Sequence, residues 1–195
     1  MNCTISDNDT IRRSKPDMQQ DKKRETIASV FIEMLNDTPL ESLRIEDLCA
    51  KAHVSKSTFY RLFRDKYDLA FWIYKKHSNE MVLGRPELSS WDEWTYHDCA
   101  HILKYKSFYR NIAAYRGQNC LYDSIALFYR SNIMNFRKNK EKPLTDDQKY
   151  AVYMHSLVNA QIMIDWILNG FEPSPDVMIH RAALCIPECI RELFE

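Results

Sequence analysis

The stretch HVSKSTFYRLF, residues 53–63, places cationic and hydroxyl side chains beside aromatic ones at helical spacing. In a helix, its apolar residues share one face, and the opposite face carries Lys56, Ser57, Tyr60 and Arg61. Lysine donates hydrogen bonds to guanine O6 and N7, and hydroxyl and guanidinium groups donate to phosphates. The pattern therefore favours contact with a nucleic acid. Periodicity alone equally allows a three-helix packing unit with a solvated cationic face.

The charge around this stretch differs from that of the whole chain. Residues 51–66 carry five cations against one acid, Asp65, a local excess of +4, whereas the formal net charge of the 195 residues is +0. This balance excludes a strongly basic DNA-coating protein and leaves room for a local basic patch. A second basic cluster, near the N-terminus, predicts an arm that reaches phosphates or the minor groove. Its members are Arg12, Arg13, Lys15, Lys22, Lys23 and Arg24.

Helix start and stop signals predict an all-α chain of about nine helices. The chain has only three glycines, and no strand-like alternation of useful length occurs. Ser55 is the expected N-cap of the helix that carries Lys56 to Arg61, and Pro187 is expected to kink or end the last helix. The expected helices are 18–36, 45–52, 55–63, 65–83, 90–105, 108–115, 119–139, 145–169 and one that begins at 174.

Residues 44–69, RIEDLCAKAHVSKSTFYRLFRDKYDL, resemble the DNA-binding core of the TetR family of bacterial transcription regulators. The matching features are Leu48, Ala52-x-Val54-Ser55, Thr58, Tyr60-x-x-Phe63 and Lys66-x-x-Leu69. The resemblance implies a helix-turn-helix followed by an all-helical domain for ligand binding and dimerisation. The expected boundaries are a flexible basic arm at 1–17, a DNA-binding domain at 18–64 and a C-terminal domain at 65–195. The stretch from Phe108-Tyr109 to Arg116-Gly117-Gln118-Asn119 is similar to a subgroup related to regulators of dihydroxyacetone kinase genes.

The resemblance also implies which side chains contact DNA. Phosphate contacts are expected from Arg44, Ser55, Thr58, Tyr60 and Lys66. Base-edge contacts are expected from Lys56, Ser57 and Arg61. Phe59 and Phe63 are expected to be core residues.

Three positions depart from the family pattern. Arg44 replaces the usual Thr at the start of the second helix, so Ser42 is expected to take the capping role. His53 replaces the usual turn glycine, and histidine tolerates a positive φ better than most residues. Ser57 replaces a glycine early in the recognition helix and adds a hydroxyl that reaches a base. Each departure is expected to change which operator is read.

The C-terminal half holds most of the aromatic residues, and the resemblance implies a cavity for an unknown small molecule there. The side chains expected to line it are Tyr96, His101, Tyr105 and Tyr122. An ordinary aromatic core explains these residues equally well. His97 and His101 lie one helical turn apart, as two metal ligands do, but no third ligand shares their face, so we expect no metal site.

The last two long helices are apolar on more than one side, as expected for helices that pack on their own domain and on a second subunit. The residues expected at a dimer interface are Met154, Val158, Ile162, Met178, Ala182 and Cys185. A two-fold dimer would place two recognition helices about 34 Å apart, one turn of DNA, or at a multiple of that turn, and would read a palindrome.

Other classes of protein are weighed by what the sequence lacks. No signal peptide or membrane-spanning run is recognisable, so we expect a cytoplasmic protein. The six cysteines form no C-x-x-C pair, and neither a disulfide framework nor a cofactor is expected. We recognise neither a nucleophile–base pair nor a phosphate loop in the sequence, so no motif indicates an enzyme. The expected function is a homodimeric, ligand-responsive regulator, with repression as the family's commoner mode. The alternative is a ligand-sensing co-regulator of the same fold that does not bind DNA.

Overall fold

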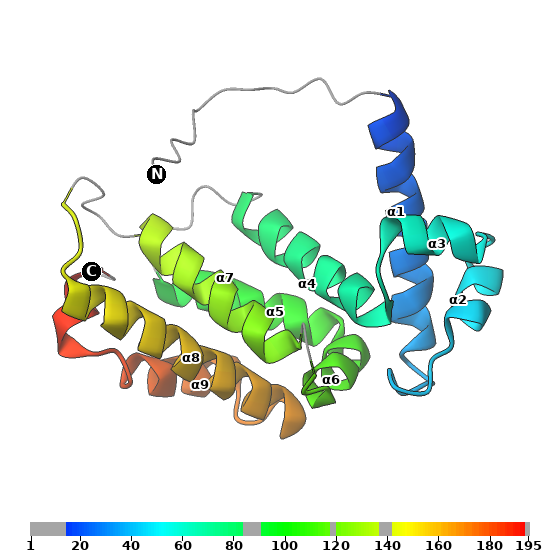
Figure 1. Ribbon diagram of the computed structural model, residues 1–195. Helices are drawn as coiled ribbons and strands as arrows, with labels where there is room; N and C mark the ends of the chain where they lie inside the picture. The colour runs from blue at the N-terminus through cyan, green and yellow to red at the C-terminus, as the bar shows by residue number, and fades with distance from the viewer. Residues whose placement is uncertain (1–14, 84–90, 118–119, 137–141, 194–195) are drawn as a thin grey trace.

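The computed structural model describes residues 15–83, 91–117, 120–136 and 142–193. These residues form nine α-helices and one 3-10 helix, which confirms the expected all-helical fold (Figure 1). The helices are α1 (Lys15–Met34), α2 (Ile45–Lys51), α3 (Lys56–Leu62), α4 (Lys66–Leu83), α5 (Trp91–Lys104), α6 (Lys106–Ala114), α7 (Leu121–Phe136), α8 (Asp146–Leu168), α9 (Pro175–Ala183) and η1 (Glu188–Leu193).

Helices α1, α2 and α3 form the end of the molecule at the right of Figure 1. Their packing is dictated by apolar residues at helical spacing, because Ile27 and Phe31 of α1, Leu48 of α2 and Phe59 of α3 are all fully buried. Phe63 is also buried, as expected. α1 begins at Lys15, inside the segment expected to be a flexible arm. Arg12 and Arg13 of that arm lie outside the described residues.

The turn between α2 and α3 has the geometry of a helix-turn-helix. His53 adopts φ 53, the left-handed conformation that the family's glycine position requires. Ser55 caps α3, and its Oγ accepts a hydrogen bond of 3.1 Å from the Thr58 N–H, which confirms the expected N-cap. Arg44 stands at the N-cap of α2 without a side-chain cap hydrogen bond, so the expected capping by Ser42 is wrong.

The remaining helices form a larger bundle. α4 leads into it from the end formed by α1–α3, α7 packs along α8, and α9 packs against α5 and α8. Thr145 and Gln148 form the reciprocal capping box expected at the start of α8, with both hydrogen bonds at 3.1 Å. α9 ends at Ala183, and η1 begins directly after Pro187, as expected from the missing N–H of proline.

Within the described ranges, no helix is long and apolar enough to cross a membrane.

The left-handed residue in the turn generates a stability prediction. We expect His53→Gly to stabilise the protein by about 1 kcal/mol, because glycine adopts a positive φ without the steric cost of a Cβ. In a chain of this size, that change raises Tm by roughly 2–4 °C in thermal unfolding. The control is Ala50→Gly at an exposed site inside α2, which should lower Tm. A lower Tm for His53→Gly would contradict the assignment.

Candidate nucleic-acid interface and ligand pocket

The outward face of α3 is open to solvent. Lys56, Ser57, Tyr60 and Arg61 are all exposed, and the Tyr60 ring, 55% exposed, stands edge-on to the buried Phe59 ring at 5.4 Å. A large aromatic side chain held this far out of the core presents its hydroxyl to a partner. The helix therefore displays one cationic and polar face while its other face holds the three-helix core.

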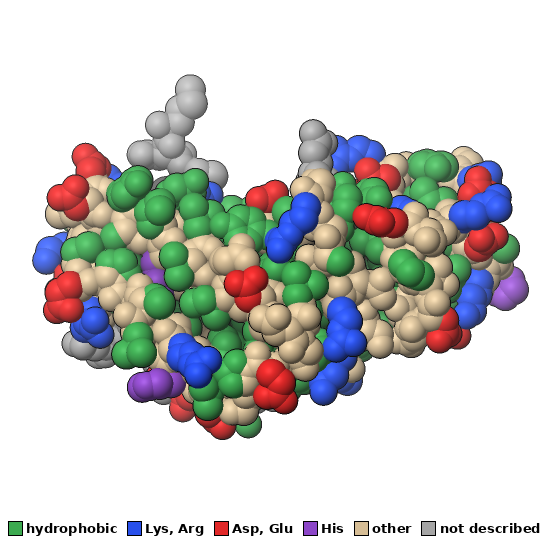
Figure 2. Space-filling view, turned by 90° about the horizontal axis from the view of Figure 1, so that it is seen from below, with side chains coloured by type: hydrophobic (Ala, Val, Ile, Leu, Met, Phe, Trp, Pro, Cys, Tyr) green, Lys and Arg blue, Asp and Glu red, His purple; other side chains and the backbone are tan. Residues whose placement is uncertain are grey.

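Two cations near this face are paired with carboxylates. Lys56 Nζ lies 2.5 Å from Glu46 Oε1 of α2, and Lys51 Nζ lies 2.8 Å from Glu33 Oε1 of α1. The hydrogen bond from Lys56 lowers the pKa of Glu46, so the carboxyl stays ionised at neutral pH. Figure 2 shows acidic and basic side chains intermingled at the right-hand end, where α1–α3 lie. A phosphate or base that binds Lys56 must therefore compete with Glu46.

Lys66 is held by backbone carbonyl groups. Its ammonium donates hydrogen bonds to the Glu41 carbonyl at 2.7 Å and to the Leu43 carbonyl at 3.0 Å. Burial lowers the pKa of Lys66, and the nearby Glu41 charge opposes that effect. An ammonium has three N–H groups, so one remains for a phosphate. Arg44 follows these carbonyls directly and is exposed.

The same loop, residues 35–44 between α1 and α2, is held from its other side by α6. Asn111 Oδ1 accepts a hydrogen bond of 3.1 Å from the Leu40 N–H, and Asn111 Nδ2 donates to the Leu35 carbonyl at 2.7 Å. One amide side chain of the C-terminal bundle thus satisfies two backbone groups of the loop that joins α1 to α2. The Phe31 and Phe108 rings add an edge-to-face contact at 6.5 Å between α1 and α6.

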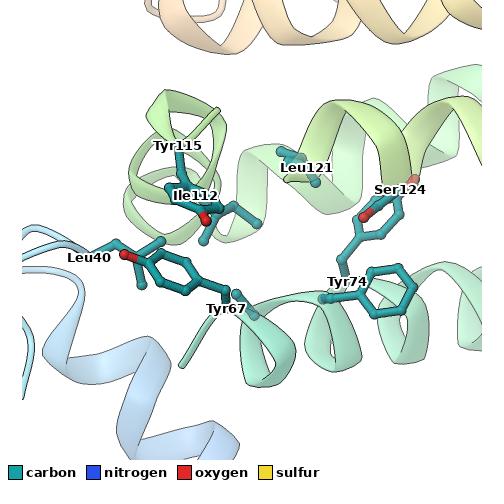
Figure 3. Close-up of a pocket in the computed structure, with 9 residues that line it drawn as sticks. Leu40, Tyr67, Tyr74, Ile112, Tyr115, Leu121 and Ser124 are labelled. Carbon is teal, nitrogen blue, oxygen red and sulfur yellow. The ribbon is translucent and has the colours of Figure 1, made fainter. Parts of the chain in front are cut away.

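A narrow pocket lies where this loop meets α4, α6 and α7 (Figure 3). Its volume is about 10 Å³, room for about one water molecule. The Tyr67 ring of α4 stacks on the Tyr115 ring at the end of α6, with ring centroids 4.0 Å apart. A Cβ at Gly117 would overlap the Tyr115 ring. Glycine at this position therefore leaves the space that the Tyr115 ring occupies. The pocket is lined by Leu40, Tyr67, Ala70, Phe71, Tyr74, Ile112, Tyr115, Leu121 and Ser124.

None of the four residues expected to bind a ligand lines this pocket. Tyr96 is 48% exposed on α5, and the Tyr122 hydroxyl donates to the Leu157 carbonyl across α7 and α8. His101 and Tyr105 lie together, with ring centroids 5.1 Å apart. Sequence reasoning missed the aromatic residues of α4 that do line the pocket. Their spacing of i, i+4 and i+7, at 67, 71 and 74, is the signal that marks them as one helix face.

The C-terminal bundle also buries an acid. Asp98 is 3% exposed, and its Oδ2 has no hydrogen-bond partner. Burial raises the pKa of Asp98 to about 7, so the carboxyl is partly protonated at neutral pH. Its charge also acts on the buried hydroxyls of Tyr74, Tyr109 and Tyr129, which come from α4, α6 and α7. The centre of the bundle is therefore polar as well as aromatic.

The residues expected at a dimer interface divide into two groups. Met154 and Val158 of α8 are exposed, Ile162 is half-buried, and Cys185 is exposed after α9. Met178, only 4% exposed, and Ala182 pack within their own chain, so we withdraw them from the interface. The reason is that α9 turns these residues toward its contacts with α5 and α8.

The exposed apolar stripe of α8 continues onto α7. Arg130 of α7 lies 5.9 Å from the centroid of the Tyr153 ring of α8, so the two stripes adjoin. Sequence reasoning missed the α7 contribution, since its apolar residues resemble those of any amphipathic helix. The exposed large apolar residues on the two helices are Leu127, Met134, Tyr150, Tyr153, Met154, Val158 and Leu168.

Comparisons with known proteins agree with both halves of this description. A family model described as bacterial regulatory proteins, tetR family, matches residues 30–71, and a model of a transcriptional regulator C-terminal region matches residues 89–187. The chain resembles the structure of the dihydroxyacetone kinase operon activator DhaS with a TM-score of 0.64 and 15% identity, over 89% of this chain and 98% of that one. It resembles a TetR transcriptional regulator from Rhodococcus sp. RHA1 with a TM-score of 0.57 and 14% identity, over 83% and 94%. No curated protein matches by sequence.

At these identities the two structures support the fold alone. The expected similarity to regulators of dihydroxyacetone kinase genes therefore stays a prediction, although DhaS is named as an activator of such an operon.

The Asn111 contacts generate a prediction about local dynamics. We expect Asn111→Ala to speed amide hydrogen exchange in residues 35–44 by about tenfold, because the Leu40 N–H loses its acceptor. The control is Asn132→Ala, which removes a side-chain amide whose Nδ2 donates to the Phe128 carbonyl of its own helix and not to the loop. Mass spectrometry of the exchanged chain resolves the loop. Unchanged exchange there would contradict the anchoring role.

Proposed function

Because this chain belongs to the TetR family of transcriptional regulators, we propose that it acts as a homodimer that binds a palindromic operator and responds to a small molecule. The observation that carries the proposal is the open, cationic face of α3, presented by a helix-turn-helix with a buried apolar core. Regulators of this family are generally not enzymes. We propose repression as the mode of action and the cytoplasm as the place.

In the proposed complex, α3 lies in the major groove. Lys56, Ser57 and Arg61 contact base edges, because they are exposed near the start and along the outer face of α3. The residues proposed to contact phosphates are Arg44, Ser55, Thr58, Tyr60 and Lys66. The Ser55 hydroxyl also lies 3.0 Å from Thr58 Oγ1, so the two act as one polar group at the helix start.

The proposed dimer forms through the adjoining apolar stripes of α7 and α8. Exposed apolar patches of this kind mark protein–protein interfaces, and an isologous interface pairs each stripe with its copy. Met154 and Val158 lie within the α8 stripe, and Ile162 supports it from a half-buried position. Two such subunits present two α3 helices to successive major grooves of the operator.

The proposed response to a ligand begins at the pocket of Figure 3. The pocket is too small for a metabolite, so a ligand must separate Tyr67 from Tyr115 and shift α6. Since Asn111 of α6 holds Leu35 and Leu40, this shift moves the loop that leads into α2. The ligand then favours a population of dimers whose two α3 helices no longer fit the operator spacing.

Operator binding is tested by mobility shift on the DNA upstream of the gene. We expect Lys56→Ala and Tyr60→Ala each to weaken binding about tenfold or more, since both lose contacts on the α3 face. Lys149→Ala is the matched control, because Lys149 is also an exposed, ion-paired lysine but lies on α8, at 2.8 Å from Asp146.

Binding that is salt-sensitive, lost in both α3 variants and kept in the control supports the proposal. If genomic selection of bound fragments also recovered no DNA, the co-regulator without DNA activity would replace it. A reporter gene placed downstream of the recovered operator distinguishes repression from activation. Higher reporter expression in the presence of the protein would contradict repression.

Dimerisation generates a second prediction here. We expect Val158→Asp to shift the protein to monomer at micromolar concentration, because it places a charge in an apolar contact. Met18→Asp is the control, since Met18 is also exposed but lies on α1 at the other end of the molecule. Sedimentation velocity measures both. A variant that stays dimeric would exclude the α7–α8 stripe as the interface.

A further inference from the structure

A second, larger hollow lies between α1 and α4, and it shares no lining residue with the pocket of Figure 3. Its volume is about 400 Å³, within the range of small-molecule sites. Ala28 and Ile32 of α1 form one wall, and Trp72 and Ile73 of α4 form the other. His77 of α4 and Tyr105, which follows α5, also line the hollow. We refer to this hollow as the α1–α4 groove.

The α1–α4 groove already holds one cationic group, the ammonium of Lys76. Lys76 Nζ lies 2.9 Å from Glu25 Oε1 of α1, 3.5 Å from Glu80 Oε1 of α4 and 5.7 Å from the centroid of the Trp72 ring. Burial opposes its charge, but the hydrogen bond to Glu25 and the charge of Glu80 raise the pKa of Lys76 overall. Two carboxylates and an indole face therefore define a position that favours a positive charge.

Next to Lys76 on α4, the groove offers a flat and uncharged surface. The His77 and Tyr105 rings stack with centroids 4.8 Å apart and planes at 20°. Burial lowers the pKa of His77 to about 3, so its imidazole is neutral at neutral pH. His101 lies behind it, 4.5 Å away between ring centroids, and its buried Nε2 has no hydrogen-bond partner. Burial also lowers the pKa of His101, so neither ring supports an anion.

A positive charge lies beside the Tyr105 ring. Lys104 Nζ lies 5.3 Å from the Tyr105 ring centroid, outside the groove lining. A second cationic group on a ligand would approach Lys104 and be repelled. The groove therefore suits a ligand with one positive charge, directed toward Glu25 and Glu80, and a flat ring system directed toward His77 and Tyr105.

We propose that the α1–α4 groove binds a flat organic monocation, which displaces Lys76 from Glu25 and Glu80 and lays its ring between Trp72 and the His77–Tyr105 pair. The Lys76–Glu25 ion pair joins α1, which packs against α2 of the helix-turn-helix, to α4 across the groove. A ligand that breaks this pair would itself bridge α1 and α4, the helix that connects the helix-turn-helix to the C-terminal bundle. The binding is separate from the α4–α6–α7 pocket and does not depend on the proposed operator.

The test compares three bicyclic probes of similar shape by isothermal titration calorimetry on the full chain without DNA. They are 1-methylquinolinium, which is cationic, quinoline, which is uncharged at neutral pH, and 1-naphthoate, which is anionic. We expect 1-methylquinolinium to bind roughly tenfold or more tightly than quinoline, and 1-naphthoate to bind weakest.

Substitutions then separate a binding role from a structural one. The Glu25→Gln and Glu80→Gln double variant should lose most of the preference for the cation while keeping its affinity for quinoline. Lys76→Met should bind 1-methylquinolinium more tightly than the wild type, because the resident ammonium no longer competes. Glu33→Gln is the matched control on α1, since Glu33 pairs with Lys51 outside the groove, and it should change neither affinity.

The proposal is overturned if no probe binds at millimolar concentration, if 1-naphthoate binds best, or if the Glu25 and Glu80 substitutions leave cation binding unchanged. Weaker cation binding by Lys76→Met would also overturn it, provided that the variant unfolds at the wild-type temperature. Because DNA is absent, these outcomes are independent of whether the chain binds an operator.

Discussion

The structure depends on how the loop between α1 and α2 is held. This loop has no helix of its own, yet it sets the position at which α2 begins and hence the direction of α3. Asn111 of α6 holds its first half through Leu35 and Leu40, and Lys66 of α4 holds its second half through two carbonyl groups. Both anchors come from the C-terminal bundle or from the helix that leads into it, so the orientation of the helix-turn-helix is fixed by the other half of the molecule.

A second constraint on DNA binding is that carboxylates of the protein and phosphates of DNA compete for the same lysine side chains. Two of the five cations in residues 51–66 are engaged with acids on neighbouring helices, in the Lys56–Glu46 and Lys51–Glu33 pairs. Exposed ion pairs of this kind contribute little to stability, so a phosphate backbone displaces them at low cost. The free protein thus keeps a neutral overall surface, and the cationic face is available to DNA. In the proposed α1–α4 groove complex, a small cationic ligand likewise displaces the ion pairs of Lys76 with Glu25 and Glu80.

Local signals explain which features the sequence predicted. The caps at Ser55 and Thr145, the positive φ at His53 and the stop at Pro187 depend on a few neighbouring residues, so they are readable without the fold. Asn111 lies 71 residues from its partner Leu40, and no short motif marks such a pair. The pocket and the exposed apolar stripes of α7 and α8 were harder to predict from the sequence for a related reason. Aromatic and apolar residues have the same periodicity whether a helix face covers a core, a cavity or a second subunit, and only the packing of α7 and α9 distinguishes them.

The most direct test of this coupling is whether DNA binding slows amide hydrogen exchange in α6. Coupling between two sites is reciprocal, so if α6 positions the helix-turn-helix, operator binding must stabilise the contacts of α6 with the loop. Amide hydrogen exchange of the wild-type chain, with and without the DNA fragment that it selects, measures this. We predict slower exchange in the DNA-bound state in residues 35–44 and 106–114 as well as in α2 and α3. Protection from exchange that is confined to α2 and α3 would contradict the coupling. The C-terminal bundle would then serve dimerisation without positioning the helix-turn-helix.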